Sequence, residues 1–154
     1  MDADTLAGIL KNFYSTFDMS SFQNRLKLQK IVYLIQTNGI NLGFGYNFYL
    51  YGPYSTDLAR AGFQITDYSK VKTMAPEDKE INRQFMAIKD KLGPRKDDIK
   101  WLECATSIIY LKRLGFVKNK IIDTVAHKLT KFPKDYINSV WSDLEEVGWI
   151  DKEN

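Results

Sequence analysis

The stretch Asp98-Ile-Lys-Trp-Leu-Glu-Cys-Ala-Thr-Ser-Ile-Ile-Tyr-Leu-Lys-Arg-Leu114 predicts the helix around which the rest of the chain packs. Its inner part, from Cys104 to Leu111, carries no charged side chain, and its apolar residues go round the whole helix. A helix that is apolar on all sides is buried in a globular protein. We therefore expect residues 98–114 to form the central helix.

On either side of this helix, apolar residues at i, i+3, i+4 and i+7 predict further amphipathic helices along the chain. Their expected boundaries follow from capping residues and from Gly or Pro at the ends. The expected helices cover 4–17, 24–38, a segment from Thr56, 76–92, a segment from Asn119 and a segment from Pro133. The fold class predicted is a mainly α, compact bundle of about six to seven helices.

Length and composition indicate one ordinary globular domain over residues 1–154. The excess of 22 Lys and Arg over 19 Asp and Glu gives a formal charge of +3, too small for a dedicated nucleic-acid binder. A single cysteine, Cys104, excludes an internal disulfide and fits a reducing compartment. The chain opens without a signal-like segment and has no run of 18 apolar residues, so we expect a cytoplasmic protein that does not span a membrane.

The region from Ile31 to Thr56 carries no charge and is rich in tyrosine and phenylalanine. Its centre predicts a short β-strand or hairpin (46–51), which Gly52-Pro53 then ends. Because side chains alternate along a strand, Tyr49 and Tyr51 are expected on the face opposite Phe48 and Leu50. This tyrosine face is either covered within the molecule or forms an aromatic patch of the kind found at interface centres, and both interpretations stay open.

Side chains that carry out catalysis are scarce in this sequence. The one histidine, His127, is expected on the polar side of its helix, and Cys104 is expected in the core. The adjacent pairs Asp97-Asp98 and Glu145-Glu146 do not face the same way on a helix, and no phosphate-binding or metalloprotease motif is present. We therefore predict no catalytic residue, no metal site and no cofactor, since an enzyme would need carboxylates brought together from distant segments.

A DNA-binding function is the alternative. Gly115 and Gly148 each follow a predicted helix and precede two apolar residues, a local pattern that is common in winged-helix domains and predicts a short strand after each helix. The last helix has an acidic excess and would be repelled by DNA. The basic residues that would contact nucleic acid are therefore Lys118, Lys120, Lys128, Lys131 and Lys134.

Two motifs in this order resemble the Panacea or SocA-like antitoxin domains, and most closely their YwgA-like relatives. The first is Arg25-Leu-Lys-Leu-Gln-Lys-Ile-Val-Tyr-Leu-Ile-Gln36. The second is Phe48-Tyr-Leu-Tyr-Gly-Pro-Tyr-Ser-Thr-Asp-Leu58. The stretch from Trp101 to Leu111 is similar to their central helix, so the resemblance covers most of the chain.

The resemblance implies a mainly helical domain that neutralises a toxin by direct binding, or an adaptor that delivers a protein to a protease. The motif positions that match the family are Lys27, Gln29, Lys30, Tyr33, Tyr51, Gly52 and Pro53. Tyr54 departs from many antitoxin members, which have a small aliphatic residue there. With Tyr49 and Tyr54 added from the tyrosine-rich surface, these residues form the predicted binding site of a non-enzymatic protein-binding module, and the oligomeric state stays open.

Overall fold

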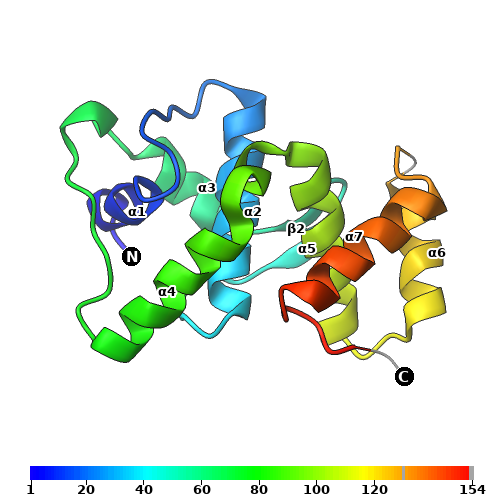
Figure 1. Cartoon of the computed structure of the whole chain (residues 1–154). Coiled ribbons are helices and arrows are strands. Elements are labelled where there is room, and N and C mark those ends of the chain that lie inside the picture. Colours follow the sequence, from blue (N-terminus) through cyan, green and yellow to red (C-terminus); the bar gives the residue numbers. More distant parts are fainter. Residues whose placement is uncertain (130, 153–154) are drawn as a thin grey trace.

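Two helices, α2 (Phe22–Thr37) and α5 (Ile99–Arg113), pack against each other at the centre of the computed structural model, which describes residues 1–129 and 131–152 (Figure 1). On the α2 side lie α1 (Ala3–Leu10), α3 (Thr56–Phe63) and α4 (Lys79–Leu92). On the α5 side lie α6 (Lys118–Lys128) and α7 (Lys134–Glu146). The remaining described elements are η1 (Tyr68–Lys70), η2 (Gly93–Asp97), β1 (Asn47–Tyr49) and β2 (Gly52–Tyr54). The predicted mainly α fold with a short hairpin is confirmed.

Helix α5 is the buried centre that its sequence predicts. Every residue from Trp101 to Ile109 is buried, and the helix begins where Asp98 Oδ1 accepts a hydrogen bond from Trp101 N at 3.0 Å. Buried side chains of all the described α-helices join in one hydrophobic cluster around it. Since burying one large apolar side chain stabilises a fold by about 1.5–3 kcal/mol, this helix is a main source of stability.

Helix α2 confirms its predicted apolar side and its predicted end. Leu28, Ile31, Val32 and Ile35 are all buried, and the chain leaves the helix through Gly39 at φ +94°. None of the helices in the described residues is long and apolar enough to cross a membrane.

The hairpin extends beyond residues 46–51, over which a short strand or hairpin is predicted. Strands β1 and β2 pair antiparallel, with Phe48 opposite Pro53 and Tyr49 opposite Gly52. Gly52-Pro53 therefore begins the second strand instead of ending the first. Proline is tolerated because both strands of a two-stranded sheet are edges. As a consequence Leu50 and Tyr51 occupy the turn, where the strict alternation of side chains does not apply.

Three predicted helix boundaries need correction. Helix α1 ends at Leu10, short of residue 17, because the Asn12 side chain donates to Ile9 O at 3.0 Å and competes with further helical bonds. Helix α4 starts after Asp78, whose Oδ1 accepts from Ile81 N at 2.9 Å, and not at residue 76. Helix α6 starts directly after Val117, without a side-chain cap from Asn119.

The winged-helix elements are not found in the described part of the chain, where β1 and β2 form the sheet. Gly115 and Gly148 do end α5 and α7 in the positive-φ region, as predicted. The residues after them use their N–H groups for capping: Phe116 N donates to Leu111 O at 3.3 Å, and Trp149 N to Leu144 O at 3.0 Å. These bonds turn the chain back on the helix and leave no strand for a wing.

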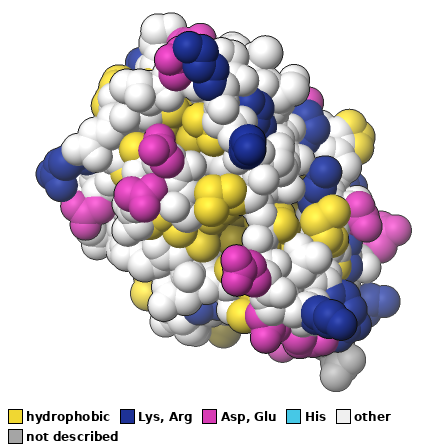
Figure 2. Space-filling view, turned by 90° about the vertical axis from the view of Figure 1, so that its left-hand side faces the viewer, with side chains coloured by type: hydrophobic (Ala, Val, Ile, Leu, Met, Phe, Trp, Pro, Cys, Tyr) yellow, Lys and Arg dark blue, Asp and Glu magenta, His cyan; other side chains and the backbone are white. Residues whose placement is uncertain are grey.

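The connector between α3 and α4 is fastened to α1. Lys11 Nζ donates to three of its carbonyl oxygens, including Val71 O at 2.7 Å, and Met74 N donates to Gly8 O at 2.9 Å. Figure 2 shows this side of the molecule, where apolar side chains gather in the middle and charged ones surround them. An apolar hollow of about 160 Å³ beside Met74 and Phe85 lies between α1, α4 and the connector.

The first prediction concerns Gly52, at φ +94°, where an added Cβ atom would collide with the buried Ser107 Oγ. Gly43 has a similar φ of +85°, but a Cβ atom added there would meet nothing within 4 Å. Both alanine substitutions strain the backbone by about 1–2 kcal/mol. We expect Gly52→Ala to lower the free energy of unfolding clearly more than Gly43→Ala, measured by urea denaturation. Equal losses would contradict a steric role for Ser107.

Candidate functional site

Two glutamines of α2 hold the chain between Phe44 and Ser55 by their side-chain amides. Gln29 Nε2 donates to Ser55 O at 2.9 Å, and Gln29 Oε1 accepts from Ser55 N at 2.8 Å. Gln36 binds Phe44 in the same two-bond manner, with both distances at 2.9 Å. Because the glutamines stand about two helical turns apart, the hairpin segment 44–55 is fixed to α2 at both of its ends.

Lys30 holds the same segment from beneath the hairpin. Its side chain is 1% exposed, and Nζ donates to Pro53 O at 2.9 Å. Burial lowers the pKa of Lys30 to about 7, while the nearby carboxylate of Glu103 acts in the opposite direction. The lysine therefore belongs to the interior of the fold.

Glu103 and Ser107 of α5 complete a buried polar centre with Lys30. Lys131 Nζ reaches Glu103 Oε2 at 2.6 Å, whereas Glu103 Oε1 and Ser107 Oγ have no hydrogen-bond partner among the described residues. Buried polar groups without partners cost stability. The amine, carboxylate and hydroxyl are chemically capable groups, but each is at most 1% exposed, so a substrate reaches them only if the hairpin moves.

The turn of the hairpin presents large apolar side chains to solvent. We name as the hairpin patch the four residues Phe22, Tyr49, Leu50 and Tyr51, which are 48%, 45%, 65% and 36% exposed. The rings of Phe22 and Tyr51 meet edge to face with centroids 5.3 Å apart. Between them and α2 lies an apolar pocket of about 310 Å³, which Leu26 and Tyr54 also line. Among the residues that the structure describes, no acidic side chain lines this pocket.

Positive charges border the rings of the hairpin. Lys131 Nζ lies 5.4 Å from the ring centre of Tyr51, and Lys128 Nζ lies 4.5 Å from that of Phe48. On the other side, the Arg25 guanidinium lies 5.6 Å from the ring centre of Phe22. Cation–π contacts of this kind stabilise an exposed site by about 0.5–1 kcal/mol. The surroundings of the hairpin patch are therefore basic.

The structure separates the predicted site residues into distinct groups. Tyr49 and Tyr51 are exposed in the hairpin patch, and Tyr54 is half-buried at its pocket. The prediction that the following residues contact a partner is corrected by their burial: Gln29, Lys30, Tyr33, Gly52 and Pro53. The first two bind hairpin backbone, and the last two form the strand that they bind, so these residues shape the surface from within.

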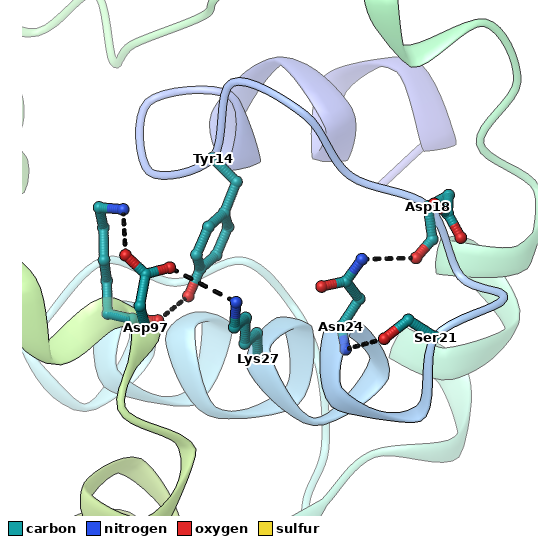
Figure 3. Close-up of polar contacts among 7 residues, drawn as sticks. Tyr14, Asp18, Ser21, Asn24, Lys27 and Asp97 are labelled. Atoms are coloured by element: carbon teal, nitrogen blue, oxygen red, sulfur yellow. Dashed lines mark hydrogen bonds and ion pairs between the residues drawn. The ribbon is translucent and has the colours of Figure 1, made fainter.

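Lys27 also lies away from the hairpin. Its Nζ is 3.4 Å from Asp97 Oδ1 and 5.3 Å from the ring centre of Tyr14, in a polar hollow of about 480 Å³ (Figure 3). Lys96 Nζ binds the same carboxylate at 2.8 Å, and hydrogen bonds from Lys96 and then Lys27 lower the pKa of Asp97. Tyr14 OH donates to Lys96 O beside them. Lys27 thus joins α2 to η2 away from the hairpin patch, and its contact with a partner stays a prediction.

The lysines of the DNA-binding alternative do not form one free basic surface. Lys131 pairs with Glu103, and Lys134 Nζ lies 2.8 Å from Asp123 Oδ1. Lys118 lies over the ring of Trp141 and Lys128 over that of Phe48, while Lys120 is exposed. Carboxylates therefore already match the charge of two of the five lysines.

Candidates for catalysis and metal binding are few among residues 1–129 and 131–152. His127 is exposed, and Cys104 is buried with its thiol pKa raised by burial to about 12, which makes it unreactive. Within these ranges no three His, Cys, Asp or Glu side chains are placed to hold a metal ion.

No protein-family model matches the chain, and neither a curated protein nor a solved structure is significantly similar to it. The resemblance to Panacea or SocA-like domains therefore stays a prediction from the two motifs. Within this chain the motifs are physically linked, because Gln29 and Lys30 of the first bind Ser55 and Pro53 of the second.

Sequence reasoning did not assign Phe22 and Leu50 to the surface. Phe22 is the first residue of α2, directly after the capping Ser21, where an apolar side chain has no preceding turn to cover it. Leu50 stands in a hairpin turn that a single-strand interpretation does not contain. The available signal was Leu50-Tyr51 directly before Gly52, because glycine there fits a tight turn as well as the end of a strand.

The second prediction uses the buried amine of Lys30. Its pKa is about 7 in the folded protein and about 10.4 in the unfolded chain, so the unfolded chain binds more protons between these values. The free energy of unfolding should therefore rise with pH through this window. We expect this rise, measured by urea denaturation between about pH 6.5 and 8.5, to be lost in Lys30→Met.

The matched control is Lys27→Met, which makes the same substitution three residues away at the half-buried ion pair with Asp97. It should keep the pH dependence of the natural protein. A slope that is unchanged in Lys30→Met would show that this amine does not titrate in the window.

Proposed function

We propose that the chain is a non-enzymatic protein-binding module whose hairpin patch receives an apolar side chain from an acidic segment of its partner. The observation that carries this proposal is the clustering of exposed Phe22, Tyr49, Leu50 and Tyr51 around an apolar pocket. Single exposed apolar residues are common on protein surfaces, but contiguous apolar patches mark interaction sites.

The composition of the hairpin patch suits the centre of an interface. Tyrosine is enriched among the residues that dominate binding energy, especially around pockets that exclude water. The turn is also held in place, because Gln29 and Lys30 fix the second strand by hydrogen bonds. A surface that is already ordered loses little conformational freedom on binding, and this supports a rigid docking site.

Charge complementarity supports an acidic partner segment. Arg25 is the half-buried charged residue of the pocket lining, and Lys128 and Lys131 lie over neighbouring rings, with Lys131 also paired with Glu103. Opposite charges around an apolar centre direct the approach of the partner and reject partners of like charge. Association should therefore slow as salt is added, because the bordering charges are screened.

The resemblance in the two motifs supports two roles for such a module. The partner would be a toxin that is neutralised by direct binding, or a protein that an adaptor delivers to a protease. Each role needs one exposed docking surface and no reaction centre. The single buried Cys104 supports a reducing, cytoplasmic setting for either role.

The third prediction tests the surface by peptide selection. A random peptide library is selected on the immobilised protein, and the enriched peptides should share an aromatic or aliphatic residue flanked by Asp or Glu. Leu50→Asp and Tyr51→Ala should each weaken these peptides by about 10-fold or more, because central interface residues contribute over 1.4 kcal/mol. Circular dichroism checks that both variants keep the fold.

Phe116→Ala is the matched control, because Phe116 is 44% exposed but lies after α5, outside the hairpin patch. Its peptide affinities should equal those of the natural protein. Binding that survives Leu50→Asp, or enriched peptides without acidic residues, would count against the proposal. A cellular protein that the chain captures is a partner of this surface if Leu50→Asp and Tyr51→Ala capture less of it and Phe116→Ala captures as much.

A further inference from the structure

A further hollow, of about 570 Å³, lies at the C-terminal ends of α2 and α5 beside the segment 39–46. We name it the tyrosine pocket, because Tyr33, Tyr46 and Tyr110 line it together with Phe44. The ring of Tyr33 lies 4.9 Å from that of Tyr46 and 6.3 Å from that of Tyr110, measured between centroids. Its volume falls in the range of about 300–1,000 Å³ that is typical of small-molecule sites.

The wall of the tyrosine pocket is held rigidly. Gln36 binds the backbone of Phe44 by two hydrogen bonds, and Tyr46 OH donates to Gln29 O at 3.1 Å. On the outer side, the ring of Tyr110 is stacked on Phe48 with centroids 5.4 Å apart. Aromatic faces fixed in this way accept a flat ring by offset stacking or edge contact, which stabilises the complex beyond the burial of apolar surface.

Arg113 gives the tyrosine pocket its charge. It is the charged residue of the lining, it is exposed, and it forms no ion pair within the described residues. The hydroxyl of Tyr33 is near enough to feel this charge: burial raises the pKa of Tyr33, and Arg113 acts against that rise. A planar guanidinium presents paired donors that match a carboxylate or a phosphate.

One effect opposes an anion here, because the C-terminal ends of α2 and α5 carry partial negative charge. This effect is weak at an exposed helix end. Part of it is already offset, since Ile40 N caps Ile35 O and Phe116 N caps Leu111 O, both at 3.3 Å. A hydrogen bond to a charged group is stronger than this effect, so the guanidinium outweighs the helix ends.

We infer that the tyrosine pocket binds a small planar aromatic molecule that carries a carboxylate or a phosphate. The ring would lie against Tyr46 and Tyr110, which are half-buried in the lining beside the buried Tyr33, and the anionic group would bind the guanidinium of Arg113. None of the residues that line this pocket also lines the pocket of the hairpin patch. The ligand site is therefore distinct from the proposed protein-binding surface and can be tested separately.

The fourth prediction compares probes that differ in their charge. Ligand-observed NMR is carried out with AMP against adenosine, and with indole-3-acetate against indole-3-acetamide, which separates a phosphate from a carboxylate ligand. At least one anionic probe should bind about 10-fold more tightly than its neutral counterpart, as expected for one charged hydrogen bond. Protein-observed NMR should show shifts at Tyr33, Tyr110 and Arg113.

Arg113→Gln should remove the preference for the anionic probe, while Arg60→Gln, at an exposed arginine of α3, should keep it. Leu50→Asp should leave probe binding unchanged, so failure of the protein-binding proposal does not affect this result. The inference is overturned if neither anionic probe binds, if neutral and anionic probes bind equally, or if the preference survives in Arg113→Gln.

Discussion

Hydrogen bonds from the polar side of α2 to the backbone between Phe44 and Ser55 are the constraint on which both surface sites depend. A hairpin of two three-residue strands is marginal by itself in water. The few hydrogen bonds between the two strands do not hold the hairpin by themselves. Additional hydrogen bonds to its backbone come from Gln29, Lys30 and Gln36. By fixing both ends of this segment, α2 positions the turn in its middle, which carries Tyr49, Leu50 and Tyr51, and the tyrosine pocket beside Phe44. The cost is a lysine kept away from water.

The main helices could be predicted because their signals are local. Between Cys104 and Leu111 the absence of charge is enough to predict burial, whatever lies around the helix. The second strand could not be predicted in this way. Whether Pro53 ends a strand depends on whether a neighbour needs its N–H, and that is decided by tertiary structure. The strands expected after Gly115 and Gly148 do not form, because the N–H groups of Phe116 and Trp149 cap the preceding helices. This too is decided by contacts that the local pattern does not contain.

The surface tyrosines and the buried polar residues illustrate two limits of the sequence. Whether Tyr49 and Tyr51 are covered depends on which residues form the turn, and the sequence left both outcomes open. Gln29 and Lys30 were predicted to contact a partner, because they match the helix motif of the family that the chain resembles. Their true partners are backbone oxygens 26 and 23 residues further along, which no periodicity reveals. The available hint was an uncharged aromatic segment that follows a helix with two glutamines seven residues apart.

The fastening of this segment to α2 also implies an order of assembly. Helices α2 and α5 can start from contacts between neighbouring residues, whereas the segment gains its bonds only after the helix that supplies them has formed. Ordering the segment before α2 has formed costs chain entropy that no hydrogen bond yet offsets. These contacts are therefore made late on the folding pathway. The hairpin should accordingly be the last part to dock and among the first to detach, which restricts both recognition surfaces to the finished fold.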